Sequence, residues 1–492
     1  MPTSRLEVDL AALDRNLAVV RAVVGGGSGA EPGRSGGGVG VCAVLKQNGY
    51  GVGASRLAER LATGGNGVEM IAVYSLDEAR AIVESIANLP VLVLMPVSGV
   101  DRSDPALRQI AAGRVHFTVH SDDQLKGLLE LAARLGVALP LHLQIDTGLS
   151  RGGALPEAGR RLVERILSGP RSRLAGLMTH FSSPCCDAEF TREQAKLFRD
   201  FVEGLKPLLR AAASSGVSLG RAGQGLTLHA ANSCALFRSK NYHGTMVRAG
   251  QALLGFALDD AATEGFEFAA QAASLRPALR WTSTVCHIGE APAGWPVGYG
   301  QTWRAPWRED KRPTRIALVP AGYADGYPRA LGGRATGGPG WVGFTGRAWE
   351  RRADESSPRG PGLAPVYAPV VGRVSMDQIT VDVTDVPEAY LSGAGRIGAG
   401  EGGPEVELMS ADRDAPNSWS AMAAAAGSIT HEQLCRVSPR VERVYRGSAA
   451  VAMASSRTPP QPGAGLSMIA SAPVAQTQHR PGEVGGVAAL SG

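Results

Sequence analysis

The chain has 492 residues, of which 44% are hydrophobic and 19% are charged, with a formal net charge of +5. This length allows two or three domains of about 100–200 residues, and the composition is typical of a folded globular protein. The basic residues form no dense block with interleaved aromatic residues, which argues against nucleic-acid binding. The sequence shows neither a secretory signal pattern nor an apolar run of about 18 residues, so we expect a cytoplasmic protein that does not bind membranes.

The positions of the lysines and cysteines bear on the chemistry that the chain can perform. Most of the basic residues are arginines and few are lysines. A lysine at the end of an apolar stretch is therefore conspicuous, and Lys46 is such a residue, at the end of VCAVLK. The 6 cysteines form no CxxC pair and no regular framework. We therefore expect free thiols in a reducing compartment, with neither disulfide bonds nor a metal site.

The first half of the chain alternates short apolar strands with helical stretches. Residues 5–24 combine a strand with an amphipathic helix, and the Gly-rich stretch 25–40 predicts a flexible surface insertion. The alternation that follows predicts a parallel α/β fold. A count of eight strands favours a (β/α)8 barrel over an open sheet. We assign this barrel to an N-terminal domain of residues 1–260. The candidate strands are VCAVLK, MIAVYS, VLVLM, VHFTVH, LHLQID, LAGLMTH, LTLHAANS and MVRAG.

The second half of the chain has a different pattern of apolar and polar residues. Alternating apolar runs separated by Gly and Pro predict a mostly β C-terminal domain over residues 261–446. Within it, residues 331–365 are rich in Gly, Pro and Arg and predict another loop insertion. Residues 447–492 lose all periodicity, so we expect a disordered C-terminal tail without chemistry.

Polar side chains follow five of the predicted barrel strands. The carboxyl ends of such strands meet at one mouth of the barrel, where catalytic groups lie. Each residue alone has an ordinary structural explanation, because a strand-end lysine usually reaches solvent and a histidine there is more often a hydrogen-bonded structural residue. Their convergence on one pocket is the stronger signal. The residues are Lys46, Asp146 and Arg151 of DTGLSRGG, His180, Asn232 with Ser233, and Arg248.

A lysine in a desolvated pocket has a lowered pKa and can form a Schiff base with an aldehyde. This chemistry suits pyridoxal 5'-phosphate (PLP), whose ring withdraws electrons from the α-carbon of an amino acid. Ser233 and the turn of residues 248–251 offer hydroxyl and N–H donors for the phosphate. The chain has no GxxxxGK[ST] loop and no convincing GxGxxG after a strand, which argues against nucleotide chemistry.

The motifs together resemble those of the alanine racemase family. They occur in the family's order between about residues 5 and 446, interrupted by the two predicted insertions. The resemblance implies a PLP enzyme with an N-terminal barrel and a C-terminal β domain, which forms a homodimer with shared active sites and acts on an amino acid. The matching stretches are CAVLKQNGYG, QIDTGLSRGG, LMTHF, HAANSCAL, VRAGQALLGF, PVGYGQTW, PAGYADGYPR and VGRVSMDQITVDV.

The resemblance also implies a role for each matching position. Lys46 would bind the cofactor covalently and act as one acid/base, and Tyr299 would act as the opposite base, reaching in from the other subunit. Arg248 would donate to the pyridine nitrogen, with His180 beside the ring. The remaining positions are Tyr50, Ser233, Gly250 and Gln251 around the phosphate, Asn232 at the cofactor, Arg151 near the phenolic oxygen and the substrate carboxylate, and Tyr323, Met376 and Asp377 of the other subunit around the substrate.

Racemisation needs two bases, because a proton leaves one face of the α-carbon and another returns to the opposite face. A lysine and a tyrosine suit this task if both pKa values fall from about 10 toward the working pH. An arginine at the ring nitrogen would not protonate it, since the arginine pKa lies above about 12. The ring is then a weaker electron sink, which should limit side reactions such as transamination.

Two positions depart from the family's pattern. In the stretch ITHE, His431 replaces a tyrosine whose hydroxyl commonly touches the phosphate. We assign His431 to the cofactor site, and the size preference for the substrate stays open. Gln144 stands where some members have a lysine that can be carbamylated. A carbamate is therefore impossible, and a neutral amide or a bound anion must support Arg151.

We predict the interconversion of L- and D-alanine, which would supply D-alanine for peptidoglycan synthesis. A racemase of the same fold that acts on serine, or on a larger or basic amino acid, is the alternative; His431 and the residues around Met376 would decide it. A catalytically silent PLP-binding protein would have to lack the second base, whereas Tyr299 is present. A PLP decarboxylase of related architecture would typically have a glutamate in place of Arg248.

Overall fold

The computed structural model describes residues 3–25, 38–63, 67–86, 89–220, 225–256, 265–333, 340–344, 364–391 and 403–447. Most of the predicted insertion at 25–40 lies outside the described residues, and so does the predicted tail beyond residue 447.

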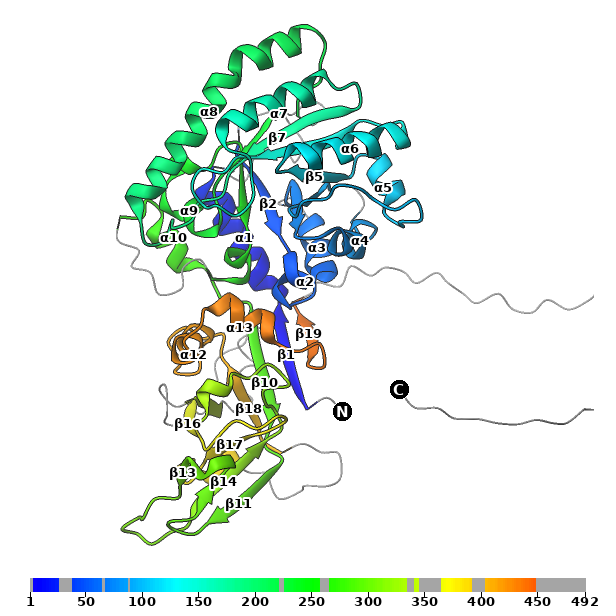
Figure 1. Cartoon of the computed structure of the whole chain (residues 1–492). Coiled ribbons are helices and arrows are strands. Elements are labelled where there is room, and N and C mark those ends of the chain that lie inside the picture. Colours follow the sequence, from blue (N-terminus) through cyan, green and yellow to red (C-terminus); the bar gives the residue numbers. More distant parts are fainter. Residues whose placement is uncertain are drawn as a thin grey trace, which may run out of the picture. The chain divides into compact units, whose positions relative to one another are not determined.

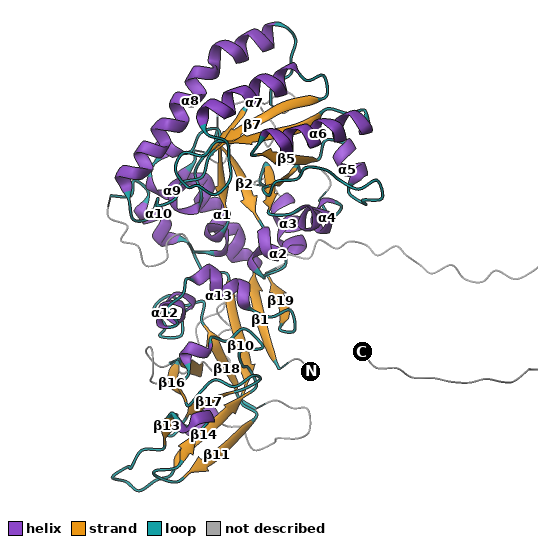
Figure 2. Cartoon of the chain, viewed as in Figure 1, coloured by secondary structure: helices purple, strands orange, loops and turns teal. Residues whose placement is uncertain are grey.

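Eight parallel strands form a near-closed barrel with helices around it (Figure 1, Figure 2). All eight strands predicted from the sequence are confirmed. They pair in the order β8-β7-β6-β5-β4-β3-β2-β9, and the two end strands meet where the Arg248 N–H donates to the Ala231 carbonyl at 2.9 Å. The strands are β2 (Gly40–Val44), β3 (Met70–Val73), β4 (Val91–Val93), β5 (Val115–Val119), β6 (Leu139–Gln144), β7 (Ser172–Met178), β8 (Thr227–His229) and β9 (Met246–Ala249).

Local sequence signals begin and end the helices of the barrel. Helix α4 begins with a capping box, in which the Ser75 hydroxyl accepts the Glu78 N–H and the Glu78 carboxylate accepts the Ser75 N–H. Helix α6 ends at Gly136, whose φ of 71° lies in the left-handed region that glycine enters most easily. The helices are α1 (Leu10–Val23), α2 (Lys46–Tyr50), α3 (Ala54–Ala62), α4 (Leu76–Val83), α5 (Leu107–Ala111), α6 (Asp122–Leu135), α7 (Pro156–Ser168), α8 (Ala188–Ser214) and α9 (Ser233–Arg238), with short 3-10 turns η1 (Lys240–Tyr242) and η2 (Gln251–Leu254).

The interior of the barrel holds polar as well as apolar side chains. Strands β5 and β6 are buried along their whole lengths, as the core of a closed parallel sheet requires. Three histidines, His116, His142 and His229, lie among the apolar residues and are at most 3% exposed. A buried imidazole is destabilising unless it is hydrogen-bonded, so these rings need partners inside the core.

The C-terminal half forms the mostly β domain that the sequence predicts. Its sheet has the order β11-β14-β17-β16-β15-β18-β10-β1-β19. The predicted loop insertion at 331–365 is wrong at one point, because Trp341–Phe344 form β15, which pairs antiparallel with β16 and β18. Four residues beside glycines carry little periodic signal, so this strand depends on its neighbours in the sheet.

The bounds of this half complete the fold. The strands are β10 (Leu279–Thr284), β11 (His287–Ala291), β14 (Thr314–Val319), β16 (Val366–Val371), β17 (Ile379–Asp382), β18 (Glu405–Met409) and β19 (Glu442–Arg446), and a separate pair joins β12 (Pro296–Val297) to β13 (Trp303–Arg304). The helices are α10 (Ala269–Ser274), α11 (Glu388–Leu391), α12 (Trp419–Ala425) and α13 (Thr430–Arg436), with 3-10 turns η3 (Tyr299–Gln301) and η4 (Arg329–Leu331).

The first strand of the chain, β1 (Ser4–Asp9), lies in this second sheet, between β10 and β19. Its register places Glu7 opposite Arg280, whose side chain is 2% exposed. The Arg280 guanidinium donates to Glu407 at 2.8 Å and to Glu7 at 3.4 Å, and both carboxylates are 4% exposed. The chain's first strand is therefore joined by buried charge to strands from its C-terminal half.

We predict that Arg280→Leu lowers the free energy of unfolding by about 3–5 kcal/mol, because it removes the cation that two buried carboxylates face. Arg436→Leu is the matched control, since Arg436 and Glu432 form a pair that is 51% exposed on both sides and should contribute about 0–1 kcal/mol. Chemical denaturation of the purified variants measures both. Equal losses in the two variants would contradict the buried-charge explanation.

Candidate active site

Lys46 follows β2 at the mouth of the barrel and opens a turn with an uncommon backbone. Gln47, Asn48 and Tyr50 have φ values of 54°, 51° and 59°, in the left-handed region that residues other than glycine rarely enter. The Glu78 carboxylate accepts the Gln47 N–H at 2.5 Å and holds the start of the turn. Such a conformation persists only where the surrounding structure enforces it, and it occurs often at functional sites.

The Lys46 amine lies in partly buried, cationic surroundings. Its pKa is lowered from the ordinary value, first by burial and then by the positive charge of Arg151. The Cys435 thiol and Glu78 act in the opposite direction. A lowered pKa increases the fraction of neutral amine, which is the form that attacks a carbonyl carbon.

Arg248, on β9, is 4% exposed and is held by backbone carbonyls. Its Nη1 donates to the His229 carbonyl at 2.6 Å, and its Nη2 donates to the carbonyls of Thr179 and Ala230 at 2.8 and 3.0 Å. Nη2 also donates to Nδ1 of His180 at 3.1 Å. Burial lowers the pKa of Arg248 to about 10, so the guanidinium remains charged at neutral pH.

His180 is a neutral imidazole beside this guanidinium. Because arginine can only donate, His180 accepts on Nδ1 and carries its proton on Nε2. Burial lowers the pKa of His180 well below the ordinary value, and the charges of Arg248, Arg151 and Lys46 lower it further. The ring therefore stays neutral at neutral pH.

The residues predicted to bind phosphate come together where β8 and β9 end. The Ser233 hydroxyl oxygen accepts the N–H groups of Gly250 and Ala252 at 3.0 and 3.3 Å. The Tyr50 hydroxyl lies so close to Gly250 that a Cβ at that position would overlap it. Gln251 follows directly and opens η2. Gly250 thus makes room for the tyrosine that the sequence places some two hundred residues earlier.

Asn232 caps a helix in this structure. Its Oδ1 accepts the Ala235 N–H at 3.0 Å at the start of α9. Capping by itself accounts for an asparagine at this position. Its assignment to the cofactor site therefore stays a prediction.

The loop that ends at Arg151 is held through its backbone. Asp146 Oδ1 accepts the N–H groups of residues 148–150 at 2.9–3.1 Å. The Gln144 amide donates to the Gly152 carbonyl at 3.1 Å. The amide that replaces a lysine in the family's pattern therefore supports the Arg151 loop by way of its carbonyls, whereas the sequence suggested support for the arginine itself.

The residues predicted to come from the other subunit are exposed in the single chain. The side chain of Tyr299, in η3, is 73% exposed, and those of Met376 and Tyr323 are 54% and 43% exposed. Large apolar groups seldom remain in water together unless another surface covers them. Exposure of this kind is required of residues that a chain contributes to its neighbour's site.

Arg440 joins the two turns that carry Tyr323 and Met376. Its guanidinium donates to both oxygens of the buried Asp325 at 2.7 and 2.9 Å, and to Asp377 at 2.8 Å. Between the turns, the Tyr323 N–H donates to the Ser375 carbonyl at 3.0 Å, and the Ala324 N–H to the Met376 carbonyl at 2.9 Å. Asp377 is thus placed to anchor Arg440.

We predict that Arg440→Met loosens both turns, because it removes a bidentate charged pair worth about 1.5–3 kcal/mol. Amide hydrogen exchange at Tyr323 and Ala324 should accelerate about tenfold or more, since each 1.4 kcal/mol corresponds to about a factor of ten. Arg312→Met removes an exposed pair with Asp310 and should leave both amides unchanged. Unaltered exchange in folded Arg440→Met would contradict this role.

Helix α13 carries His431 and, one turn later, Cys435. The helix packs against the turn that follows Lys46, so that a Cβ on Gly51 would lie 2.8 Å from the Leu434 carbonyl oxygen. The charge of Lys46 lowers the pKa of the Cys435 thiol, although burial raises it more. His431 therefore lies on the helix that packs against the turn after Lys46.

Sequence reasoning missed several residues of this site. Cys435 has no local signal, because only the folded chain brings α13 to the turn that follows Lys46. Glu78 has only the local signal of a helix start, three residues after Ser75, and nothing in the sequence indicates its second contact, with the Gln47 N–H. The barrel histidines were visible as polar residues inside apolar strands, in VHFTVH, LHLQID and LTLHAANS.

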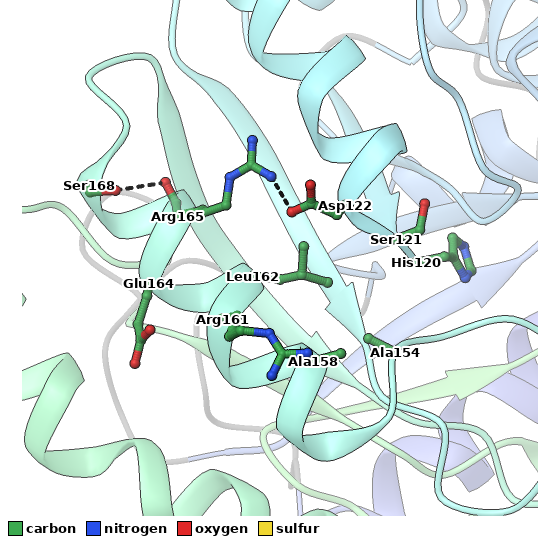
Figure 3. A pocket seen from close by; sticks show the side chains of 10 residues that line it. All are labelled: His120, Ser121, Asp122, Ala154, Ala158, Arg161, Leu162, Glu164, Arg165 and Ser168. Carbon is green, nitrogen blue, oxygen red and sulfur yellow. Dashed lines mark hydrogen bonds and ion pairs between the residues drawn. The ribbon is translucent and has the colours of Figure 1, made fainter.

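A separate hollow of about 740 Å³ lies where α7 faces the start of α6 (Figure 3). Arg165 forms an ion pair with Asp122 in its wall. None of the predicted site residues lines it, so the hollow is distinct from the mouth described above. Its lining residues are His120, Ser121, Asp122, Ala154, Ala158, Arg161, Leu162, Glu164, Arg165 and Ser168.

Two absences hold for the part of the chain that the structure describes. There, no helix combines the length and the apolar character needed to cross a membrane. Nor does that part contain three or more His, Cys, Asp or Glu side chains grouped as metal ligands. All six cysteines lie in the described residues, and none of them forms a disulfide bond there.

Comparison with known proteins gives consistent matches along the chain. A family model described as alanine racemase, N-terminal domain, matches residues 8–257, and one described as alanine racemase, C-terminal domain, matches residues 278–445. An alanine racemase of Desulfovibrio desulfuricans is 29% identical over 441 residues, which cover 89% of this chain and 97% of that protein. The crystal structure of alanine racemase from the D-cycloserine-producing Streptomyces lavendulae is 25% identical, with a TM-score of 0.67 and coverage of 91% and 98% of the two chains. The alanine racemase from Bartonella henselae with covalently bound pyridoxal phosphate is 21% identical, with a TM-score of 0.64 and coverage of 91% and 100%.

Proposed function

Because this chain belongs to the alanine racemase family, we propose that it is a PLP-dependent enzyme that interconverts L-alanine and D-alanine. The D-alanine would serve peptidoglycan synthesis, with the enzyme in the cytoplasm. The observation that carries the proposal is the presence of a lysine of lowered pKa and a buried, charged arginine at the mouth of one barrel. An identity of 29% supports the family more strongly than the choice of alanine.

The side chains at this mouth suit PLP. Lys46 offers an amine whose lowered pKa favours the neutral form. The Ser233 oxygen accepts two backbone N–H groups, so its own proton is available to a phosphate oxygen. Arg151 adds positive charge for the phenolic oxygen of the cofactor and for a substrate carboxylate, and Arg248 offers N–H donors to the ring nitrogen. When bound, PLP draws electrons from the α-carbon and makes its proton acidic.

The protein's own groups would move that proton. Lys46 Nζ would exchange a proton with one face of the α-carbon, and the Tyr299 hydroxyl of a neighbouring chain would exchange one with the other face. Arg248 would face the ring nitrogen and keep its proton, since its pKa of about 10 lies well above neutral pH. His180, which accepts from Arg248 on Nδ1, would present its Nε2–H to the same pocket.

A racemase for serine or for a larger or basic amino acid is the second candidate. His431 favours it, because this residue replaces a tyrosine of the family's pattern on a helix that packs against the Lys46 turn. A panel of L-amino acids, each assayed for loss of optical rotation with and without added PLP, distinguishes the two. A protein that binds PLP but racemises none of them would be the silent binder.

If Lys46 binds the cofactor, Lys46→Ala should lose covalently attached PLP after borohydride reduction, as measured by intact mass. D-alanine formation should fall by at least about 10²–10⁴-fold, the usual contribution of a general acid or base. Lys126→Ala is the control, since Lys126 is exposed on α6. A reducible adduct that survives in Lys46→Ala would assign the cofactor to another lysine.

If Tyr299 completes the neighbour's site, Tyr299→Phe should slow α-proton exchange chiefly in one direction. Racemisation needs both bases, so neither Lys46→Ala nor Tyr299→Phe should racemise alanine by itself. Mixing the two kinds of chain under subunit exchange should then restore racemisation, because each heterodimer rebuilds one intact site. Random pairing predicts recovery of about one quarter of the wild-type rate. No recovery in confirmed heterodimers would place both residues in the same chain's site.

A further inference from the structure

Three histidines inside the barrel form a continuous hydrogen-bonded series that ends on Arg248. Nδ1 of His116 lies 3.0 Å from Nε2 of His142, and Nδ1 of His142 lies 2.9 Å from Nε2 of His229. Nδ1 of His229 lies 3.3 Å from Nη1 of Arg248. We call His116, His142 and His229 the histidine string.

The direction of these hydrogen bonds follows from the chemistry of arginine. A guanidinium only donates, so His229 accepts on Nδ1 and carries its proton on Nε2. That proton is donated to Nδ1 of His142, which must then be protonated on Nε2 and donate to His116. All three rings adopt the same tautomer, and their acceptor nitrogens point toward the positive charge.

The barrel is built to hold these rings. The cores of such barrels are filled mainly by branched apolar side chains, so three imidazoles are a departure. Gly176, on β7, makes the space, because a Cβ there would overlap the imidazole of His142. Burial, followed by the charges of Arg173 and Arg248, lowers the pKa of His142 to about 3, so its ring is neutral at neutral pH.

Neutral acceptors suit a buried arginine that must keep its charge. A carboxylate would hold Arg248 as firmly, but it would cancel the positive charge that the site presents to a cofactor. The string instead accepts a hydrogen bond on one side of the guanidinium, while backbone carbonyls and His180 accept on the other. Both Nη atoms are then engaged, which fixes the plane of the guanidinium.

We propose that the histidine string positions Arg248, so that side chains two and three hydrogen bonds away set how this arginine meets the cofactor ring. His116, His142 and His229 are positioning residues, since they act through Arg248. This inference rests on the proposed function for the role of Arg248 toward PLP. It goes beyond that proposal by assigning a task to core residues that lie behind the site.

The experiment breaks the string at its centre. His142→Leu removes the acceptor for His229 and leaves Arg248 and all proposed contacts with PLP in place. Outer residues of this kind typically change affinity or activity by about 10–100-fold. We expect the affinity for PLP, measured by titration of the apoprotein, to weaken within that range. The absorption maximum of bound PLP should shift, and kcat should fall by a larger factor than KM rises.

Two further variants separate positioning from simple core packing. His142→Gln keeps one acceptor and one donor and should recover most of the wild-type absorption spectrum. His243→Leu replaces a buried histidine outside the string, whose ring hydrogen-bonds the Leu236 carbonyl at 2.8 Å and stacks on Phe268, and it should leave PLP binding and the spectrum unchanged. A normal spectrum and normal PLP affinity in folded His142→Leu would overturn the proposal, as would equal effects in His243→Leu.

A measurement on the wild-type protein covers the case in which His142→Leu does not fold. Nitrogen-15 NMR of labelled histidine should show the Nε2–H tautomer for all three rings of the string at neutral pH. A protonated Nδ1 on His142 or His229 would refute the series. Neither the PLP titration nor the NMR measurement of the tautomers depends on turnover. A wild-type protein that binds PLP but does not racemise alanine would therefore contradict the proposed function and leave the histidine string as proposed.

Discussion

The burial of one guanidinium governs the arrangement of this site. Removing a charge from water is costly unless hydrogen bonds replace the lost solvent, and Arg248 is 4% exposed. The ends of β7 and β8 meet this demand, since the carbonyls of Thr179, His229 and Ala230 all accept from it. Because these strand ends converge on one group, the residues that follow them, His180 and Ser233, are brought to the same place.

Lys46, which follows the neighbouring strand β2, lies close to the same charged groups. Strand β2 pairs with β9 so that Cys42 lies opposite Arg248, and Lys46 follows two residues after β2 ends. Burial and the nearby charge of Arg151 lower the pKa of Lys46. A mouth lined by two arginines and a lysine suits ligands that carry negative charge, such as a phosphate or a carboxylate. Electrostatics and strand register therefore act together on the reactive amine.

The C-terminal domain presents exposed side chains on short turns. Tyr299, Tyr323 and Met376 stand exposed on short turns, and the pair of Arg440 with Asp325 fixes two of these turns through their backbones. A rigid, exposed group is costly to a free chain and useful at an interface, where preorganisation reduces the entropy lost on binding. Under the proposed function, the barrel supplies one acid/base and the exposed turns supply the other to a second barrel.

Much of this protein could be inferred from its sequence, because the deciding signals are local. Mostly apolar stretches of five to eight residues mark the eight barrel strands, and the polar residues at their ends share one mouth because parallel strands end together. The site residues from Lys46 to Arg248 follow from that rule and from the family's motifs.

Other features depend on pairings between distant segments, which no local pattern encodes. The folded chain alone moves β1 into the C-terminal sheet, adds β15 within an expected loop and brings Cys435 toward Lys46. The barrel histidines were plain in the sequence as polar residues in apolar strands, but their series became visible only in the closed barrel. Sequence order determines which side chains are available, whereas the distances between them, and hence their hydrogen bonds and pKa values, come from tertiary packing.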